Sequence, residues 1–244
     1  MNQTLSGQAK GRRRILPVAA LLLCATLFAA LGTWQVKRLA WKEALIAHVS
    51  AVSTAAPVDA AKLPSAPDAA TLDDLEYRQV SVSGRFDPAG TTLVSALTEL
   101  GAGYWVLAPL RLEDGRAIWI NRGYVPLGST RGQQATLLPT SPQSLIGLLR
   151  KSEAPSNILR ANQPEAERWY FRNLPQIAAK AGVKDSGIAW FIDAKAESAP
   201  AKGQPVAGLT VIAFPNNHLP YAITWFGLCA MCFGGIWLVL RHRG

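Results

Sequence analysis

The chain has 244 residues, of which 49% are hydrophobic and only 17% are charged, and its formal net charge is +9. This composition excludes a disordered basic tail, a collagen-like chain and a disulfide-dense scaffold, and three cysteines are too few for a disulfide framework. An excess of Lys and Arg is typical of nucleic-acid binding when it forms a surface patch. In so apolar a chain it fits a membrane protein better, and we expect no nucleic-acid partner.

Two stretches without a charge lie near the two chain ends. They run from Ile15 to Trp34 and from Tyr221 to Leu240, with 20 residues each. At 1.5 Å per residue, a helix of this length spans about 30 Å, the thickness of the hydrocarbon core of a bilayer. We therefore predict transmembrane helices over residues 15–36 and 221–240, with the lipid bilayer as a partner.

The first stretch has a second interpretation as a secretory signal peptide. Three arginines, Arg12 to Arg14, precede it, and it passes through Phe28-Ala29-Ala30, a pattern that signal peptides share. Its length favours a helix that is retained. So does the group of basic and aromatic residues that follows it, because such side chains anchor helix ends at the headgroups: Trp34, Lys37, Arg38 and Trp41.

The basic residues outside the two stretches predict the topology. Residues 1–14 and 241–244 together carry six Lys or Arg and no acidic residue. By the positive-inside rule both basic tails lie in the cytoplasm, and residues 37–220 form an exported domain. We expect a multi-pass protein of the bacterial inner membrane with a periplasmic central domain. In a mitochondrion the same domain would face the intermembrane space.

The first part of the exported segment changes from helix to strand. Leu39–Ala47 continues the first helix, and residues 51–70, rich in Ala and Pro, predict an irregular segment. A short acidic helix over Thr71–Leu75 follows. From Tyr77 apolar and polar residues alternate, which predicts a strand with one buried face. Gly84 falls on that apolar face and indicates a bulge or a close backbone contact.

The remaining pattern predicts an α+β domain. Asp114-Gly115 lies between two apolar stretches, Tyr104–Leu112 and Arg116–Val125, and predicts a β-hairpin with a type I′ turn. One helix, Leu174–Ala181, should end at Gly182. Further strands are predicted over Thr92–Leu97, Ser144–Arg150, Ala189–Ala194 and Leu209–Ala213. The fold class is therefore an α+β membrane protein, with two transmembrane helices flanking a mainly antiparallel curved sheet or partly closed barrel.

Motifs for catalysis are missing from the sequence. It contains no nucleophile elbow, no phosphate-binding glycine loop and no His-Glu-x-x-His motif. Asp87, Asp114 and Asp193 fall at strand and turn positions, and we interpret them as surface or turn residues. Cys229 and Cys232 form a C-x-x-C inside an apolar stretch, where cysteine usually packs as a small apolar residue. We predict that the protein is not an enzyme and has no catalytic residues.

His218 stands directly before the second apolar stretch. A helix that starts there places His218, Tyr221, Ala222 and Trp225 on one face. A titratable imidazole at the edge of a membrane is a candidate functional group. Imidazole binds haem iron, and aromatic side chains suit the wall of a macrocycle pocket. The alternative is a capping or interfacial histidine that bonds to the neighbouring loop.

Four segments, in this order, resemble the surfeit locus protein 1 family (the Surf/Shy family of cytochrome c oxidase assembly factors), in its bacterial form. The first, Leu31–Arg38 (LGTWQVKR), resembles the family's Gly-x-Trp-Gln-x-x-Arg element at the end of the first span. The others are Tyr77–Phe86, Gly103–Pro126 with its WINRGYVP, and Asn216–Phe226 with its NNHL. Residues 51–70 match nothing in the family pattern, and Asn173 stands where an acidic residue is expected.

The resemblance implies a non-enzymatic assembly factor that assists the delivery or insertion of haem a into subunit I of cytochrome c oxidase. Haem A synthase is a further candidate partner. His218 would bind the haem iron transiently, as the metal ligand, with Tyr221 and Trp225 beside it. The alternative function is a membrane-anchored scaffold that binds oxidase subunits without haem.

Three basic residues could meet haem propionates in this interpretation. Arg38 and Lys42 follow the first span, where they could equally reach lipid phosphate. Arg122, in the predicted hairpin, could instead orient its strand by pairing with a carboxylate.

Overall fold

The computed structural model describes residues 4–154, 160–184, 186–196, 199–209 and 214–241, with side chains from residue 14 onward. The chain divides into two compact units. One comprises residues 1–48 and 213–244, and the other comprises residues 49–212. Each unit is described by itself.

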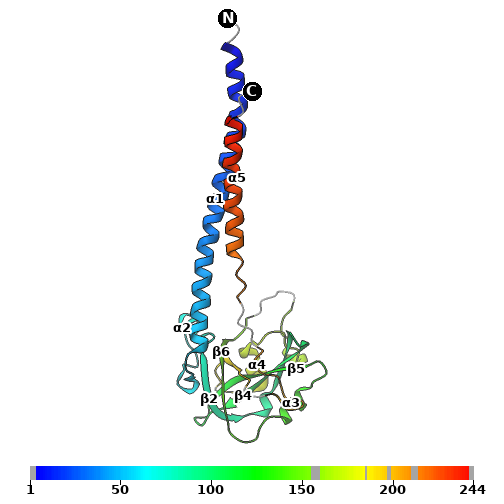
Figure 1. The fold of residues 1–244 in the computed structure, drawn as a ribbon. Helices are drawn as coiled ribbons and strands as arrows, with labels where there is room; N and C mark the ends of the chain where they lie inside the picture. The colour runs from blue at the N-terminus through cyan, green and yellow to red at the C-terminus, as the bar shows by residue number, and fades with distance from the viewer. Residues whose placement is uncertain (1–3, 155–159, 185, 197–198, 210–213, 242–244) are drawn as a thin grey trace. The chain divides into compact units, whose positions relative to one another are not determined.

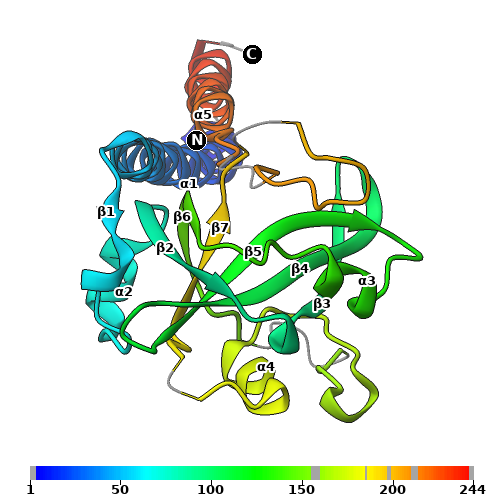
Figure 2. The ribbon, with the colours of Figure 1, turned by 90° about the horizontal axis from the view of Figure 1, so that it is seen from below.

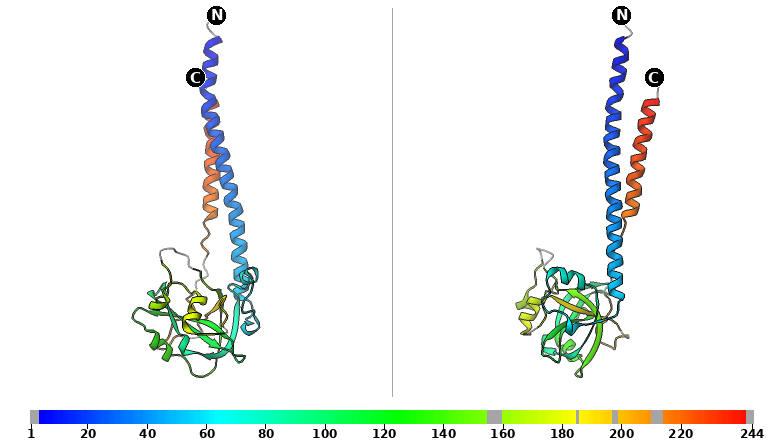
Figure 3. Two further views of the ribbon diagram at one scale, coloured as in Figure 1. Left: turned by 180° about the vertical axis from the view of Figure 1, so that it is seen from behind. Right: turned by 90° about the vertical axis from the view of Figure 1, so that its left-hand side faces the viewer.

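The first unit is a pair of helices, α1 (Thr4–Thr54) and α5 (His218–Arg241). Both are long and apolar enough to cross a membrane, over Arg14–Thr54 and His218–Arg241. The two predicted spans lie inside them, and the predicted continuation of the first helix is confirmed. The helices lie side by side, as Figure 1 and both views of Figure 3 show.

Small and aromatic residues form the contact between α1 and α5. The Phe28 and Trp225 rings stack with their centroids 5.7 Å apart, and the Cys229 thiol donates to the Ala25 carbonyl oxygen at 3.4 Å. A Cβ added at Gly32 would lie 2.8 Å from the Phe226 ring. The helices can approach closely because the residues at these crossings are small, which is common between apolar helices. Cys229 packs in this contact, as predicted.

The second unit is built on a sheet of seven strands. Its order is β1-β2-β6-β7-β5-β4-β3, and β2 also pairs with β4. The strands β2, β6, β7, β5 and β4 therefore form a closed ring, and all five are labelled in Figure 2. The β1–β2 and β5–β7 pairs are parallel and the others antiparallel. The strands are β1 (Val58–Asp59), β2 (Gln79–Phe86), β3 (Thr92–Thr98), β4 (Gly101–Arg111), β5 (Ala117–Pro126), β6 (Gln143–Lys151) and β7 (Trp190–Ala194).

The predicted alternation of apolar and polar residues along the strands accounts for the apolar interior of the barrel. Apolar side chains of β2, β4, β5, β6 and β7 form one buried cluster, which includes Val80, Leu110, Ile120, Leu149 and Ile192. The prediction for Gly84 is confirmed, since a Cβ there would lie 2.3 Å from the Arg111 carbonyl oxygen. This approach lies at the short β2–β4 seam that closes the barrel, where Arg85 and Phe86 pair with Arg111 and Leu110.

Three helices belong to the barrel unit: α2 (Ala69–Leu75), α3 (Arg131–Thr136) and α4 (Leu174–Ala181). Leu174 and Ile177 of α4 pack on Trp119 and Phe191 in a second buried cluster. Gly182 ends α4 in a left-handed conformation with φ 65°, as predicted. The 3-10 turns are Ala60–Lys62, Pro88–Gly90 and Pro164–Ala166.

Two predictions need correction. The β4–β5 hairpin exists, but its turn is not type I′, because Gly115 has a positive φ of 86° and Asp114 does not. Gly115 N donates to Leu112 O at 3.1 Å, so the loop is a type I turn followed by a left-handed glycine. Residues 51–70 are not irregular throughout, since α1 extends to Thr54 and short elements follow. Most of the predicted strand Leu209–Ala213 lies outside the described residues.

Candidate functional site

His218, the first residue of α5, is paired with a residue of α1. Its Nδ1 lies 2.7 Å from Oε1 of Gln35, and Gln35 is only 9% exposed. An amide oxygen can only accept a hydrogen bond, so this contact is made by the neutral tautomer with its proton on Nδ1, in which Nε2 keeps a lone pair, or by the imidazolium. A histidine whose Nδ1–H is held in this way is oriented to bind a metal through Nε2.

The structure places the other predicted residues of α5 in two environments. Ala222 is buried, the Trp225 ring stacks on Phe28 and His218 contacts Gln35, so these three residues share one face of α5, as predicted, and that face packs on α1. Tyr221 is 56% exposed and lies off that face.

The two basic residues of α1 also differ. The Arg38 guanidinium lies 3.9 Å from the centre of the Trp41 ring on its own helix, and its side chain is exposed. Nζ of Lys42 lies 5.1 Å from the Phe214 ring, which precedes α5 by four residues. Lys42 therefore contacts the segment just before His218, which the sequence alone does not indicate.

Gln35 is the residue that sequence reasoning missed. Thr26 and Thr33, which are also polar and lie in the first apolar stretch, donate to carbonyl oxygens of their own helix, Leu22 O and Ala29 O. The Gln35 amide reaches another helix instead. A signal was available, because Gln35 follows Phe28 by seven residues and so shares its helical face.

The next question is which metal-binding side chains lie near His218. The cysteines Cys24, Cys229 and Cys232 are free, and the described residues contain no group of three or more His, Cys, Asp or Glu side chains that could hold a metal ion. A single imidazole suits a ligand whose other coordination positions are already filled, as in a haem.

A buried ionic network lies in the barrel unit, and it corrects the interpretation of Asp193. Asp193 is 4% exposed, not a surface residue. It accepts a hydrogen bond from Asn121 Nδ2 at 2.8 Å and lies 3.4 Å from guanidinium nitrogens of both Arg150 and Arg172. Alternation puts Asp193 on the face of β7 opposite to Ile192, where charged partners replace the apolar core.

Arg172 connects Asp193 to a second carboxylate. Burial would raise the pKa of Glu153, but the hydrogen bonds and charge of Arg172 outweigh it and hold that pKa below its usual value. Burial likewise opposes the charge of Arg172, while Asp193 and Glu153 raise its pKa. The Asn173 amide also donates to Glu153 O at 3.0 Å while its oxygen caps α4. An aspartate at position 173 could provide only the cap.

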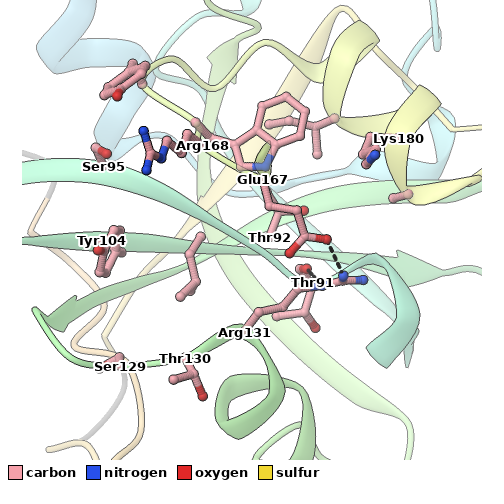
Figure 4. Close-up of a pocket in the computed structure, with 15 residues that line it drawn as sticks. Thr91, Thr92, Ser95, Tyr104, Ser129, Thr130, Arg131, Glu167, Arg168 and Lys180 are labelled. Atoms are coloured by element: carbon pink, nitrogen blue, oxygen red, sulfur yellow. Dashed lines mark hydrogen bonds and ion pairs between the residues drawn. The ribbon is translucent and has the colours of Figure 1, made fainter. Parts of the chain in front are cut away.

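A polar pocket of about 410 Å³ lies between β3 and α4. Figure 4 shows its basic residues Arg131, Arg168 and Lys180 among hydroxyl side chains, with Arg131 paired to Glu167 at 2.9 Å. Arg131 also donates to Thr91 O. Its guanidinium thus joins the loop before β3 to the segment after β6.

These features define a class of protein whose sequence runs from one long apolar helix through a small β-barrel unit to a second apolar helix, with a paired imidazole at the start of the second helix. Residues 22–230 match the model of the SURF1 family. The chain is 34% identical to surfeit locus protein 1 of Rattus norvegicus and of Homo sapiens, over 86% of this chain and 71% and 72% of theirs. It is also 34% identical to a SURF1-like protein of Monosiga brevicollis, over 92% of this chain and 87% of that one. The chain belongs to the SURF1 family.

Proposed function

We propose that this protein is an assembly factor for cytochrome c oxidase that assists the delivery or insertion of haem a into subunit I. In this proposal α1 and α5 cross the bacterial inner membrane, both termini lie in the cytoplasm and the barrel is periplasmic. The role is non-enzymatic: the protein holds haem transiently and passes it on, with subunit I and haem A synthase as its partners.

The pairing of His218 with Gln35 carries the proposal. A hydrogen bond from Nδ1–H to the Gln35 oxygen orients the ring and, in the neutral imidazole, leaves the lone pair of Nε2 for the iron that we propose it binds. A histidine with only a capping role would not need a partner on a different helix. The family membership supports the same reading, because the resemblance of the NNHL segment implies a haem-binding role for His218.

The surroundings of His218 suit a ligand that must be released. One axial imidazole binds haem less tightly than two, which favours transfer to an apoprotein. The stacked Phe28 and Trp225 rings add aromatic side chains to the helix pair, seven residues along α5 from His218. In the proposal the exposed Tyr221 lies at the edge of the haem macrocycle, and Arg38 or Lys42 pairs with the haem propionates.

The test is the visible spectrum of the full chain, purified in detergent from cells that make haem a. We expect bound haem in the unmodified protein and its loss in His218→Ala. His48→Ala is the matched control, because His48 is an exposed histidine of α1. Absence of haem from the unmodified protein, or equal haem in the protein and its His218→Ala variant, would overturn haem binding by His218.

A deletion strain tests the assembly role separately. The expected result is an oxidase with less haem a than in the parent strain, and an unchanged haem content would contradict the proposal. If the strain loses oxidase while the purified protein never binds haem, the scaffold function is the correct one.

A further inference from the structure

Arg122 lies in the mouth of the barrel. Ile118 and Ile120 of β5 point into the buried cluster and are 5% and 0% exposed. Alternation along the strand puts Arg122 on the same inward face, one step closer to the barrel end. Its guanidinium lies 5.6 Å from the centre of the Phe86 ring at the end of β2. The Arg122 guanidinium therefore occupies a position on the inward face of β5 where the alternation predicts an apolar side chain.

The charge of Arg122 has no carboxylate partner in the described part of the chain. Nη2 donates to the amide Oε1 of Gln204 at 2.7 Å, and Nη1 is buried without a hydrogen-bond partner among the described residues. Burial lowers the pKa of Arg122 to about 10. The predicted pairing of Arg122 with a strand-orienting carboxylate is therefore not what the structure shows. A buried cation without a counter-charge is costly unless an anion compensates it.

The local backbone fixes this guanidinium in place. Gly123 has a φ of 123°, and a Cβ there would lie 2.2 Å from the Val206 carbonyl oxygen. This allows Tyr124 and Val206 to exchange backbone hydrogen bonds of 2.9 and 2.8 Å. Gln204 is held in turn, because its Nε2 donates to Leu137 O at 3.0 Å. The backbone bonds between Tyr124 and Val206, and the anchored side chain of Gln204, therefore hold Arg122 in position.

A pocket of about 650 Å³ opens beside Arg122, a size typical of sites for small molecules. The exposed Lys195 lies at its rim, and its described lining residues include no carboxylate. Most of its wall is apolar, and includes Phe86, Ile120, Pro139, Leu145, Pro205 and Val206. Barrel mouths are common places for such sites.

We propose that the barrel mouth binds a small amphiphilic carboxylate, with its carboxylate on Arg122 and its apolar body on the wall around Phe86 and Leu145. One part-buried guanidinium matches a monoanion, whereas a phosphate dianion would leave charge for which the described lining residues offer only Lys195. The proposal is independent of His218, which belongs to the other unit, so either can fail without the other.

The probe is hexanoate, titrated into the full chain in detergent and followed through the arginine Nε–H resonances. Arg122→Lys assigns the Arg122 signal. We expect hexanoate to shift this signal saturably and to bind about tenfold more tightly than the neutral hexanamide, because hydrogen bonds to charged groups are the stronger ones. Acetate, which lacks the apolar body, should bind more weakly than hexanoate.

Variants locate the site. Because the Arg122 variants lack the Arg122 Nε–H signal, hexanoate binding to them is followed through the side-chain amide resonances of Gln204, whose oxygen accepts from Arg122. Arg122→Gln should abolish hexanoate binding and Lys195→Gln should weaken it, while Arg168→Gln, in the polar pocket of Figure 4, should leave it unchanged. If Arg122→Gln does not fold, Arg122→Lys serves instead and should bind hexanoate more weakly. Equal binding of hexanoate and hexanamide, tighter binding of inorganic phosphate, unchanged affinity in the Arg122 variants, or no saturable shift would each overturn the proposal.

Discussion

The side-chain amide of Gln35 accepts a hydrogen bond from the imidazole of His218 at 2.7 Å, and this bond joins α1 to α5. Along the described contacts of the pair, stacked rings and small residues come next, with Phe28 against Trp225 and Ala25 against Cys229. The polar contact therefore lies at the His218 end of an apolar interface. It costs the desolvation of both groups, and it gives the imidazole one orientation.

Replacing Gln35 by Leu should weaken haem binding without removing the ligand itself. Loss of a residue that orients a metal-bound histidine lowers affinity by about 10- to 100-fold, and we expect a change in that range in a haem titration followed by absorbance. Gln35→Glu keeps an acceptor for Nδ1–H and should retain binding. Thr33→Val is the matched control, because Thr33 bonds only to its own helix. Equal affinity in Gln35→Leu and the unmodified protein would refute an orienting role.

Asp193→Asn should destabilise the barrel strongly. The substitution removes the buried charge that both Arg150 and Arg172 contact. Since Arg172 keeps Glu153 and Arg150 keeps Glu76, we expect a loss of about 1–3 kcal/mol, the cost of removing a partner from a buried charged group. Urea unfolding of the chain in detergent, followed by tryptophan fluorescence, measures the loss. Asp114→Asn, at an exposed turn, should change stability by no more than about 0.5 kcal/mol. Similar midpoints for the two variants would show that the network contributes little.

The same network predicts a pH dependence. Arg172 holds the pKa of Glu153 below its usual value in the folded state, so the folded state binds this proton less readily than the unfolded chain. The stabilisation from Glu153 is therefore complete above the unfolded pKa of about 4.3. It is lost as the pH falls through the lower folded value.

Unfolding experiments from neutral pH to below pH 4 test this sign. The unmodified chain should lose stability in the acid range, and Glu153→Gln should show a flatter curve there together with lower stability at neutral pH. Glu165→Gln is the control, because the Glu165 side chain is 93% exposed. A curve for Glu153→Gln that falls as steeply as that of the unmodified chain would contradict the assignment.

The strands were predictable because their signals are local. Alternation over Val80 and Val82, and the glycine that ends α4, depend on neighbours a few residues away. The closure of the barrel is different, because β2 meets β4 through residues far apart in the chain, such as Phe86 and Leu110, which are 24 positions apart. The pattern of a strand predicts which of its faces is buried. It does not predict with which distant strand it pairs to close the sheet.

The site residues also divide into those that the local sequence indicates and those whose role depends on a distant partner. His218 stands out because an imidazole beside an apolar stretch is rare, whereas Gln35 gains its meaning only from the helix that packs against it. Asp193 was misread because the pattern of β7 does not indicate what covers its second face. There Arg172, from a segment 21 residues earlier in the chain, supplies the charge that permits burial.

Gly84→Ala tests whether the β2–β4 seam closes the barrel. The added Cβ would lie 2.3 Å from the Arg111 carbonyl oxygen, and backbone cannot yield as a flexible side chain does. We expect a loss of about 1–3 kcal/mol, the usual cost of overpacking, with faster hydrogen exchange at the amides of Arg85 and Phe86. Gly132→Ala is the matched control, because nothing lies within 4 Å of its added Cβ and alanine favours the helix α3. If the two substitutions have equal effects on stability and exchange, the close approach at Gly84 is not what holds the seam together.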